Sequence, residues 1–167
     1  MATAVYGQDP RDQFFDTLKS LCGARFEGAK TFPADSSDSF AGQLLVAEVT
    51  SCTTVALRVP FAVGTDRSRT WVFTRIGGGL QLKHDHRHPD GTPDAITMYG
   101  GMAGLSGTSL AQSFAADAYT ATLIPAASTN VWTVSLSADS LTLTYHLERG
   151  SQPRFTAVLK RVRRASP

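Results

Sequence analysis

The sequence of 167 residues has no long apolar run and little net charge. No hydrophobic stretch approaches the roughly 18 residues that a membrane-spanning helix needs, so we expect no membrane span. The formal net charge is only +2, which is too small to indicate a nucleic-acid partner. The length suits one domain over residues 1–167. What remains is a globular chain.

Cysteine is equally scarce, because the chain contains only Cys22 and Cys52. Their spacing excludes a zinc ribbon and a Cys-x-x-Cys redox motif. It leaves open one disulfide or two separate buried thiols. Residues 1–7 lack the basic and apolar regions of a signal peptide. A peptide that had been removed would leave the same start, so the compartment stays open between the periplasm or exterior and the cytoplasm.

Motifs of high specificity for catalysis are missing. The chain has no Gly-x-Ser-x-Gly nucleophile elbow. The glycines at 100, 101, 104 and 107 are not followed by the Gly-Lys-Ser/Thr of a phosphate-binding loop. The chain also lacks an alternating strand–helix rhythm, which argues against a doubly wound parallel sheet.

One amphipathic helix is predicted over residues 10–22. Asp9 is a suitable N-cap, Pro10 suits the first helical position, and Gly23 suits the end of the helix. The apolar side chains recur at helical spacing and need another element to cover them: Phe14, Phe15, Leu18, Leu21 and Cys22. The end of a barrel would satisfy this requirement.

Short alternating segments separated by turns follow from residue 24 to about residue 162. Clear examples are 55–61 and 141–148, in which apolar residues occupy every second position. Such a series is typical of a sandwich or barrel. We therefore predict an all-β fold, an antiparallel β-barrel of about eight to ten strands with one N-terminal helix.

A histidine cluster stands out within the predicted strand that begins at Leu80. Side chains on a strand alternate between its two faces, so His84, His86 and His88 share a face with Leu80 and Leu82. The histidines thus continue an inward, apolar stripe. This placement is unusual, because a buried imidazole needs hydrogen-bond partners.

Three interpretations of this cluster remain open. In the first, His84 and His86 bind zinc or another divalent metal, with a further ligand from another strand. In the second, the histidines form the polar pole of a ligand cavity, or one of them transfers a proton. In the third, His88 and His86 lie at a solvated rim and His84 bonds a neighbour. The candidate partners on other segments are Glu48, Asp94 and Tyr99.

The hairpin before the histidines predicts further inward side chains. If Trp71 and Phe73 face inward, Arg69 and Arg75 share that face. An inward arginine would suit a carboxylate or phosphate on a ligand, whereas arginines at strand ends would lie in water. Tyr145 is on the apolar face of another strand.

Two stretches carry resemblances to known proteins. The segment Gly23-Ala24-Arg25-Phe26-Glu27-Gly28 after the helix resembles the start of lipocalin-like (calycin) barrels, although Phe26 stands where a tryptophan is usual. The stretch from Ser68-Arg69-Thr70-Trp71 to Lys83-His84-Asp85-His86-Arg87-His88 resembles a set of small bacterial proteins, often exported, with no activity to transfer. The calycin resemblance implies a barrel that holds one small, mostly apolar ligand.

Two functions follow as competing hypotheses. The first is binding of a small, mostly apolar ligand inside the barrel, through side chains at positions spread over four segments: His84, His86, His88, Arg69, Arg75, Trp71, Phe73 and Tyr145. The alternative is a small barrel enzyme of isomerase, cyclase or hydrolase type, in which His84 or His86 moves a proton. Its partner would be Tyr99, Asp94 or Glu48, and an arginine would stabilise the developing negative charge. A purely structural or interaction module is a third possibility. The sequence requires no cofactor and does not determine the oligomeric state.

Overall fold

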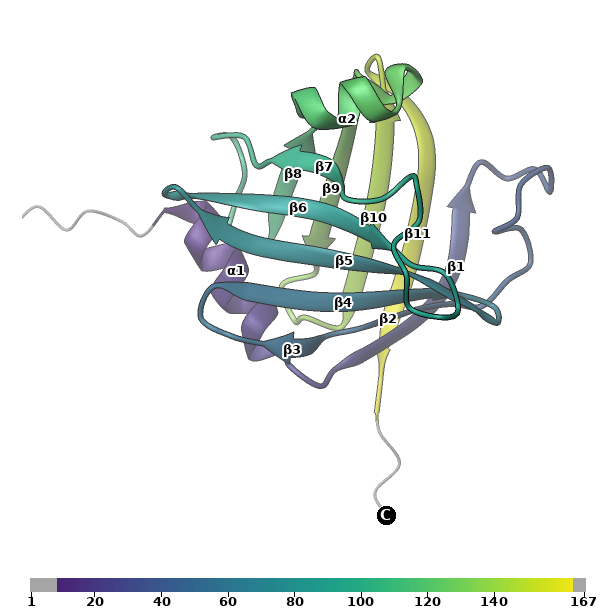
Figure 1. Ribbon diagram of the computed structural model, residues 1–167. Coiled ribbons are helices and arrows are strands. Elements are labelled where there is room, and N and C mark those ends of the chain that lie inside the picture. Colours follow the sequence, from purple (N-terminus) through teal and green to yellow (C-terminus); the bar gives the residue numbers. More distant parts are fainter. Residues whose placement is uncertain (1–8, 164–167) are drawn as a thin grey trace, which may run out of the picture.

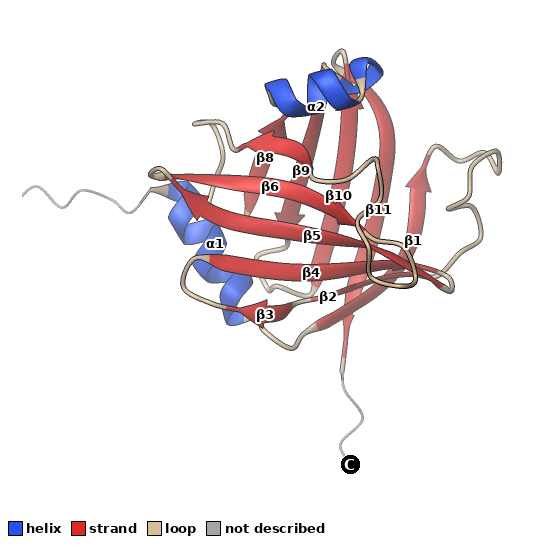
Figure 2. Cartoon of the chain, viewed as in Figure 1, coloured by secondary structure: helices blue, strands red, loops and turns tan. Residues whose placement is uncertain are grey.

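The computed structural model describes residues 9–163, which form a β-barrel with helices at its margins (Figure 1; Figure 2). In chain order the elements are α1 (Pro10–Ser20), β1 (Arg25–Phe32), β2 (Leu45–Glu48), β3 (Thr50–Cys52), β4 (Ala56–Val63), β5 (Asp66–Ile76), β6 (Gly79–His86), β7 (Tyr99–Met102), β8 (Ala111–Ala115), α2 (Ala118–Leu123), the 3-10 helix η1 (Pro125–Ala127), β9 (Asn130–Leu136), β10 (Thr142–Arg149) and β11 (Gln152–Val162). No helix in this range is both long and apolar enough to cross a membrane.

The strands form one antiparallel sheet that curls into a nearly closed barrel. Their order is β7-β6-β5-β4-β2-β1-β11-β10-β9-β8, with the short β3 paired to β4. The first and last strands of this order meet at a single bridge between Ala103 and Phe114. The predicted fold class is therefore confirmed, and the architecture is compatible with a calycin-like barrel.

Helix α1 covers one end of the barrel (Figure 1). The Asp9 side chain accepts a hydrogen bond from the Arg11 backbone N–H at 2.8 Å, as expected of the N-cap. The helix ends at Ser20, two residues earlier than predicted, and Gly23 then adopts a left-handed φ of 84°. Its apolar face is buried against the sheet, through Phe14, Phe15 and Leu18.

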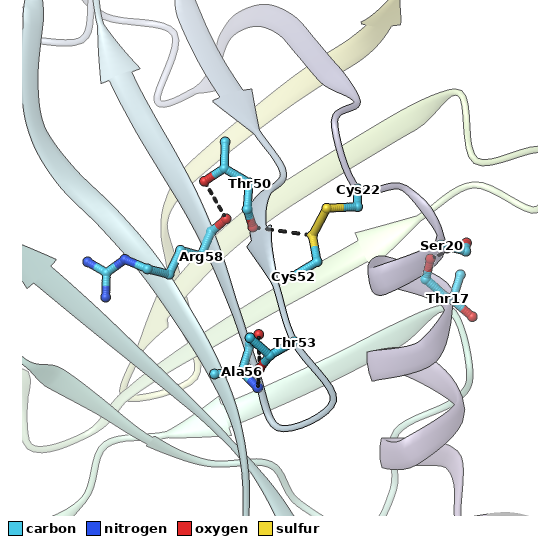
Figure 3. Close-up of a disulfide and its surroundings, with 8 residues drawn as sticks. All are labelled: Thr17, Ser20, Cys22, Thr50, Cys52, Thr53, Ala56 and Arg58. Carbon is cyan, nitrogen blue, oxygen red and sulfur yellow. Dashed lines mark hydrogen bonds between the residues drawn. A yellow bond between two sulfur atoms is a disulfide. The ribbon is translucent and has the colours of Figure 1, made fainter.

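A disulfide links the segment after α1 to the barrel wall. Cys22 lies just beyond the helix, and Cys52 ends the short strand β3; Figure 3 shows the bond between them. Of the two alternatives for the cysteines, the structure shows the disulfide. The bond holds the C-terminal end of α1 beside β3.

Aromatic side chains fill the barrel interior on the α1 side and around its middle. Trp71 stacks between Phe61 and Tyr145, with ring centroids 4.6 and 4.7 Å away. Phe73 lies nearer to α1, with its ring 6.2 Å from that of Phe14. Trp71 and Phe73 thus point inward, as the alternation predicts, and both are almost fully buried. The open space in the barrel lies beyond this aromatic layer.

Candidate ligand-binding site

A cavity of about 390 Å³ occupies the end of the barrel remote from α1. Helix α1 lies near the start of β6, where Arg11 approaches Gly79, whereas His86 at the end of β6 lines the cavity. The mainly apolar part of the lining consists of Phe40, Ile96, Ile124, Ala127, Trp132, Tyr145, Leu147 and Phe155. The polar part consists of His86, Asp94, Tyr99, Asn130 and Arg149. The cavity is therefore an apolar space with a few polar groups in its wall.

His84 lies behind the cavity wall, with only 3% of its surface exposed. Its Nδ1 is 3.1 Å from the Tyr99 carbonyl oxygen, and its Nε2 is 2.8 Å from the Tyr145 hydroxyl. A carbonyl oxygen only accepts hydrogen bonds, so Nδ1 carries the proton and Nε2 accepts from the Tyr145 O–H. Burial lowers the pKa of His84 to about 3, which agrees with this neutral tautomer. The ring therefore positions Tyr145 and the Tyr99 backbone without lining the cavity itself.

This buried histidine predicts a loss of stability in mild acid. The pKa of His84 is about 3 in the folded protein, against 6.5 for an unperturbed histidine. Between these pH values the unfolded chain binds one more proton than the folded protein does. The contribution of His84 to the free energy of unfolding is therefore fully present above pH 6.5 and is lost progressively as the pH falls. We expect the free energy of unfolding, measured by urea denaturation, to decrease by about 2 kcal/mol from pH 7 to pH 5.

Two variants separate this cause from general acid effects. His84→Gln, which cannot titrate, is expected to be less stable at pH 7 but to lose much less further stability at pH 5. His88→Gln is expected to keep the wild-type pH dependence, because the His88 ring is exposed. An unchanged pH dependence in His84→Gln would contradict the assignment.

His86 and Tyr99 form the polar pair that does reach the cavity. His86 Nε2 lies 3.0 Å from the Tyr99 hydroxyl, and Thr97 Oγ1 accepts a 2.7 Å bond from the His86 backbone N–H. Burial lowers the pKa of His86, and the positive charge of Arg69 lowers it further. Burial also raises the pKa of Tyr99 to about 12. At neutral pH both groups are therefore uncharged and share one hydrogen bond.

Two residues of the polar lining, Asn130 and Arg149, were not predicted from the sequence. Arg149 Nε donates to Asn130 Oδ1 at 2.8 Å, and Asn130 is itself only 4% exposed. The sequence did carry a signal for Arg149, because it follows Tyr145 and Leu147 at every second position of β10. The signal was missed because a charged residue normally marks the solvated face of a strand.

Arg75, predicted as a ligand contact, lies at the opposite end of the barrel. Its Nε and Nη2 pair with Asp12 and Asp16 of α1, both at 2.9 Å. Its guanidinium also lies 4.2 Å from the centroid of the Phe15 ring. Arg75 does share the inward face with Trp71, but α1 supplies its partners.

Two other predicted contacts, Arg69 and His88, do not line the cavity. Arg69 pairs with Asp66 at 2.5 Å, and its guanidinium lies 5.4 Å from the Phe40 ring centroid, beside the cavity. His88 lies beyond the end of β6 and is exposed, because the strand ends at His86. Of the eight predicted ligand contacts, the structure thus brings His86 and Tyr145 to the cavity, together with Tyr99, which was predicted as a catalytic partner.

Metal binding by His84 would require a different arrangement of its ring. Both of its nitrogens already have hydrogen-bond partners. Within residues 9–163, no group of three or more histidine, cysteine, aspartate or glutamate side chains is placed to hold a metal ion.

No family model matches the chain, and no curated protein or solved structure matches it significantly. The structural class of this protein is therefore defined from its own fold and site. It is a nearly closed antiparallel β-barrel with one N-terminal helix, compatible with the calycin-like barrels. An apolar cavity lies at the end of the barrel remote from that helix.

Proposed function

We propose that this barrel binds a small, mostly apolar ligand in the cavity at the end remote from α1. The observation that carries the proposal is the cavity of about 390 Å³ with a mainly apolar lining. Sites for small molecules typically have volumes of about 300–1,000 Å³ and a few polar groups that fix orientation. The ligand's apolar body would pack against Trp132, Leu147 and Phe155.

The polar groups of the cavity support this proposal because other groups hold them in place. Tyr99 bonds His86, and Arg149 bonds the buried Asn130. His84 accepts a hydrogen bond from Tyr145, whose ring lines the cavity. Groups that are already ordered cost less conformational entropy when a ligand binds. A polar end of the ligand would meet His86, Tyr99 or Arg149.

Tryptophan fluorescence tests the proposal directly. The chain has two tryptophans, of which Trp132 lines the cavity and Trp71 is stacked in the core. Titration with 1-octanol is expected to change the emission in a saturable manner. The Trp132→Phe variant should lose most of that change while circular dichroism shows the fold intact. An emission that does not respond to octanol would contradict the proposal.

Filling the cavity is expected to block binding. In Leu147→Trp the larger ring would occupy space that the ligand needs, and we expect octanol affinity to fall by at least about tenfold, or about 1.4 kcal/mol. Leu141→Trp is the matched control, because Leu141 lies outside the cavity and is 50% exposed. This control should bind octanol within about twofold of the wild type. If Leu147→Trp and Leu141→Trp bound octanol with equal affinity, the ligand would bind outside the cavity.

A second candidate function is proton transfer to or from a bound substrate. It rests on the His86–Tyr99 hydrogen bond of 3.0 Å at the cavity wall, because an uncharged imidazole within reach of a substrate can act as a general base. His84 would then be a positioning residue, since it does not line the cavity. His86→Gln and Tyr99→Phe would each abolish turnover of a converted compound while circular dichroism shows the fold intact. Full turnover in both variants would exclude this role.

A further inference from the structure

A second cleft, of about 440 Å³, adjoins the cavity. Asp94 lines both spaces, so the two lie next to each other at this residue. One wall of the cleft is the end of the β4–β5 turn and the start of β5, at residues 65–68, and the other is the loop after β6, at residues 87–89. The cavity and the cleft therefore adjoin at Asp94.

Backbone hydrogen bonds hold the walls of this cleft in place. The Arg87 N–H donates to the Ser68 carbonyl at 2.9 Å, which ties one wall to the other. The His88 N–H donates to the Thr92 carbonyl at 2.9 Å, and the Asp94 N–H donates to the His86 carbonyl at 3.0 Å. These bonds fix the positions of the two walls relative to each other.

The charges along the cleft balance one another. Its lining has two arginines, Arg67 and Arg87, and two aspartates, Asp66 and Asp94. Arg69 already pairs with Asp66, and Asp85 already pairs with Arg87. An ionic group would therefore meet both charge signs at once, whereas a hydroxyl both donates and accepts hydrogen bonds and suits such mixed partners.

We propose that the cavity and the cleft together accommodate an elongated amphiphile with a neutral, polyhydroxylated head, such as a sugar. The inference rests on the proposed function, because the apolar body would occupy the cavity described above. The head would lie in the cleft, with Asp94 at the junction and Arg67 and His88 beside it. Ser68 and Thr65 add two further hydroxyls to the lining.

Two probes with the same alkyl chain test the head group. Octyl β-D-glucoside, used below its micelle-forming concentration, is expected to bind at least about fivefold more tightly than 1-octanol, since one net hydrogen bond contributes about that factor. Octanoate and octylammonium should bind more weakly than the glucoside. Trp132 emission reports all four titrations.

The outcomes separate this inference from the proposed function. If octanol binds and the glucoside binds no more tightly, the head-group inference is wrong and the apolar site stands. If octanoate or octylammonium binds more tightly than the glucoside, the cleft recognises charge, and the inference is likewise wrong. If none of the four probes changes the emission, the proposed function itself fails.

A double variant tests whether the cleft is responsible for the preference. Arg67 and His88 are exposed, so Arg67→Ala combined with His88→Ala should leave the fold intact, as circular dichroism would verify. We expect this variant to bind the glucoside no more tightly than octanol, with octanol affinity unchanged. Arg154→Ala, an exposed arginine of β11, is the matched control and should keep the full preference. A preference retained in the double variant would overturn the inference.

Discussion

Phe14→Ala is expected to lower the free energy of unfolding by about 3–5 kcal/mol, the range typical of a truncated core phenylalanine. Phe14 is fully buried, and its ring lies 6.2 Å from that of Phe73 in β5. The substitution would leave an empty space between α1 and the barrel end, where neither element can collapse without disturbing the other. Urea denaturation followed by circular dichroism measures the loss.

A control and a second readout make this result specific. Leu141→Ala also truncates a large apolar side chain, but one that is 50% exposed, so we expect a change within about 1 kcal/mol. Folded Phe14→Ala should still bind octanol within about twofold of the wild type, because α1 and the cavity lie at different ends. A loss of stability no larger than that of Leu141→Ala would show that α1 does not seal the core.

Replacing both cysteines by serine is expected to lower the free energy of unfolding by about 3–4 kcal/mol in the loop-entropy model. The bond joins residues separated by 30 positions, and so it restricts the unfolded chain considerably. In the folded protein the bond only connects segments that already pack together. The double variant, Cys22→Ser with Cys52→Ser, should therefore keep the native circular dichroism spectrum.

Reduction provides an independent measurement of the same bond. Dithiothreitol should destabilise the wild type by a similar amount and have no effect on the double variant. Equal stability of oxidised and reduced wild type would show that the bond contributes nothing.

Local patterns in the sequence were sufficient to predict much of the fold. The N-cap at Asp9 and the helical spacing after it predicted α1 to within two residues of its observed end. Alternation in β5 predicted that Trp71 and Phe73 point inward, because the side-chain period of a strand is two wherever the strand lies. These features depend only on neighbours in the chain, and so they can be predicted from the sequence.

The candidate site depended on contacts between distant segments. His84 and Tyr145 are 61 positions apart, and their hydrogen bond decided that His84 is a buried positioning group. Arg75 was predicted to face the interior, but alternation does not specify its height along the barrel, where α1 supplies its partners.

The sequence by itself therefore determined the class of fold, the N-terminal helix and the inward face of several strands. Only the tertiary structure decided that the cysteines are joined, that the core is filled at the α1 end, and that His86, Tyr99 and Arg149 border the same space. The physical reason is that periodicity reports the face on which a side chain lies, whereas a cavity forms where strand ends from separate parts of the chain meet.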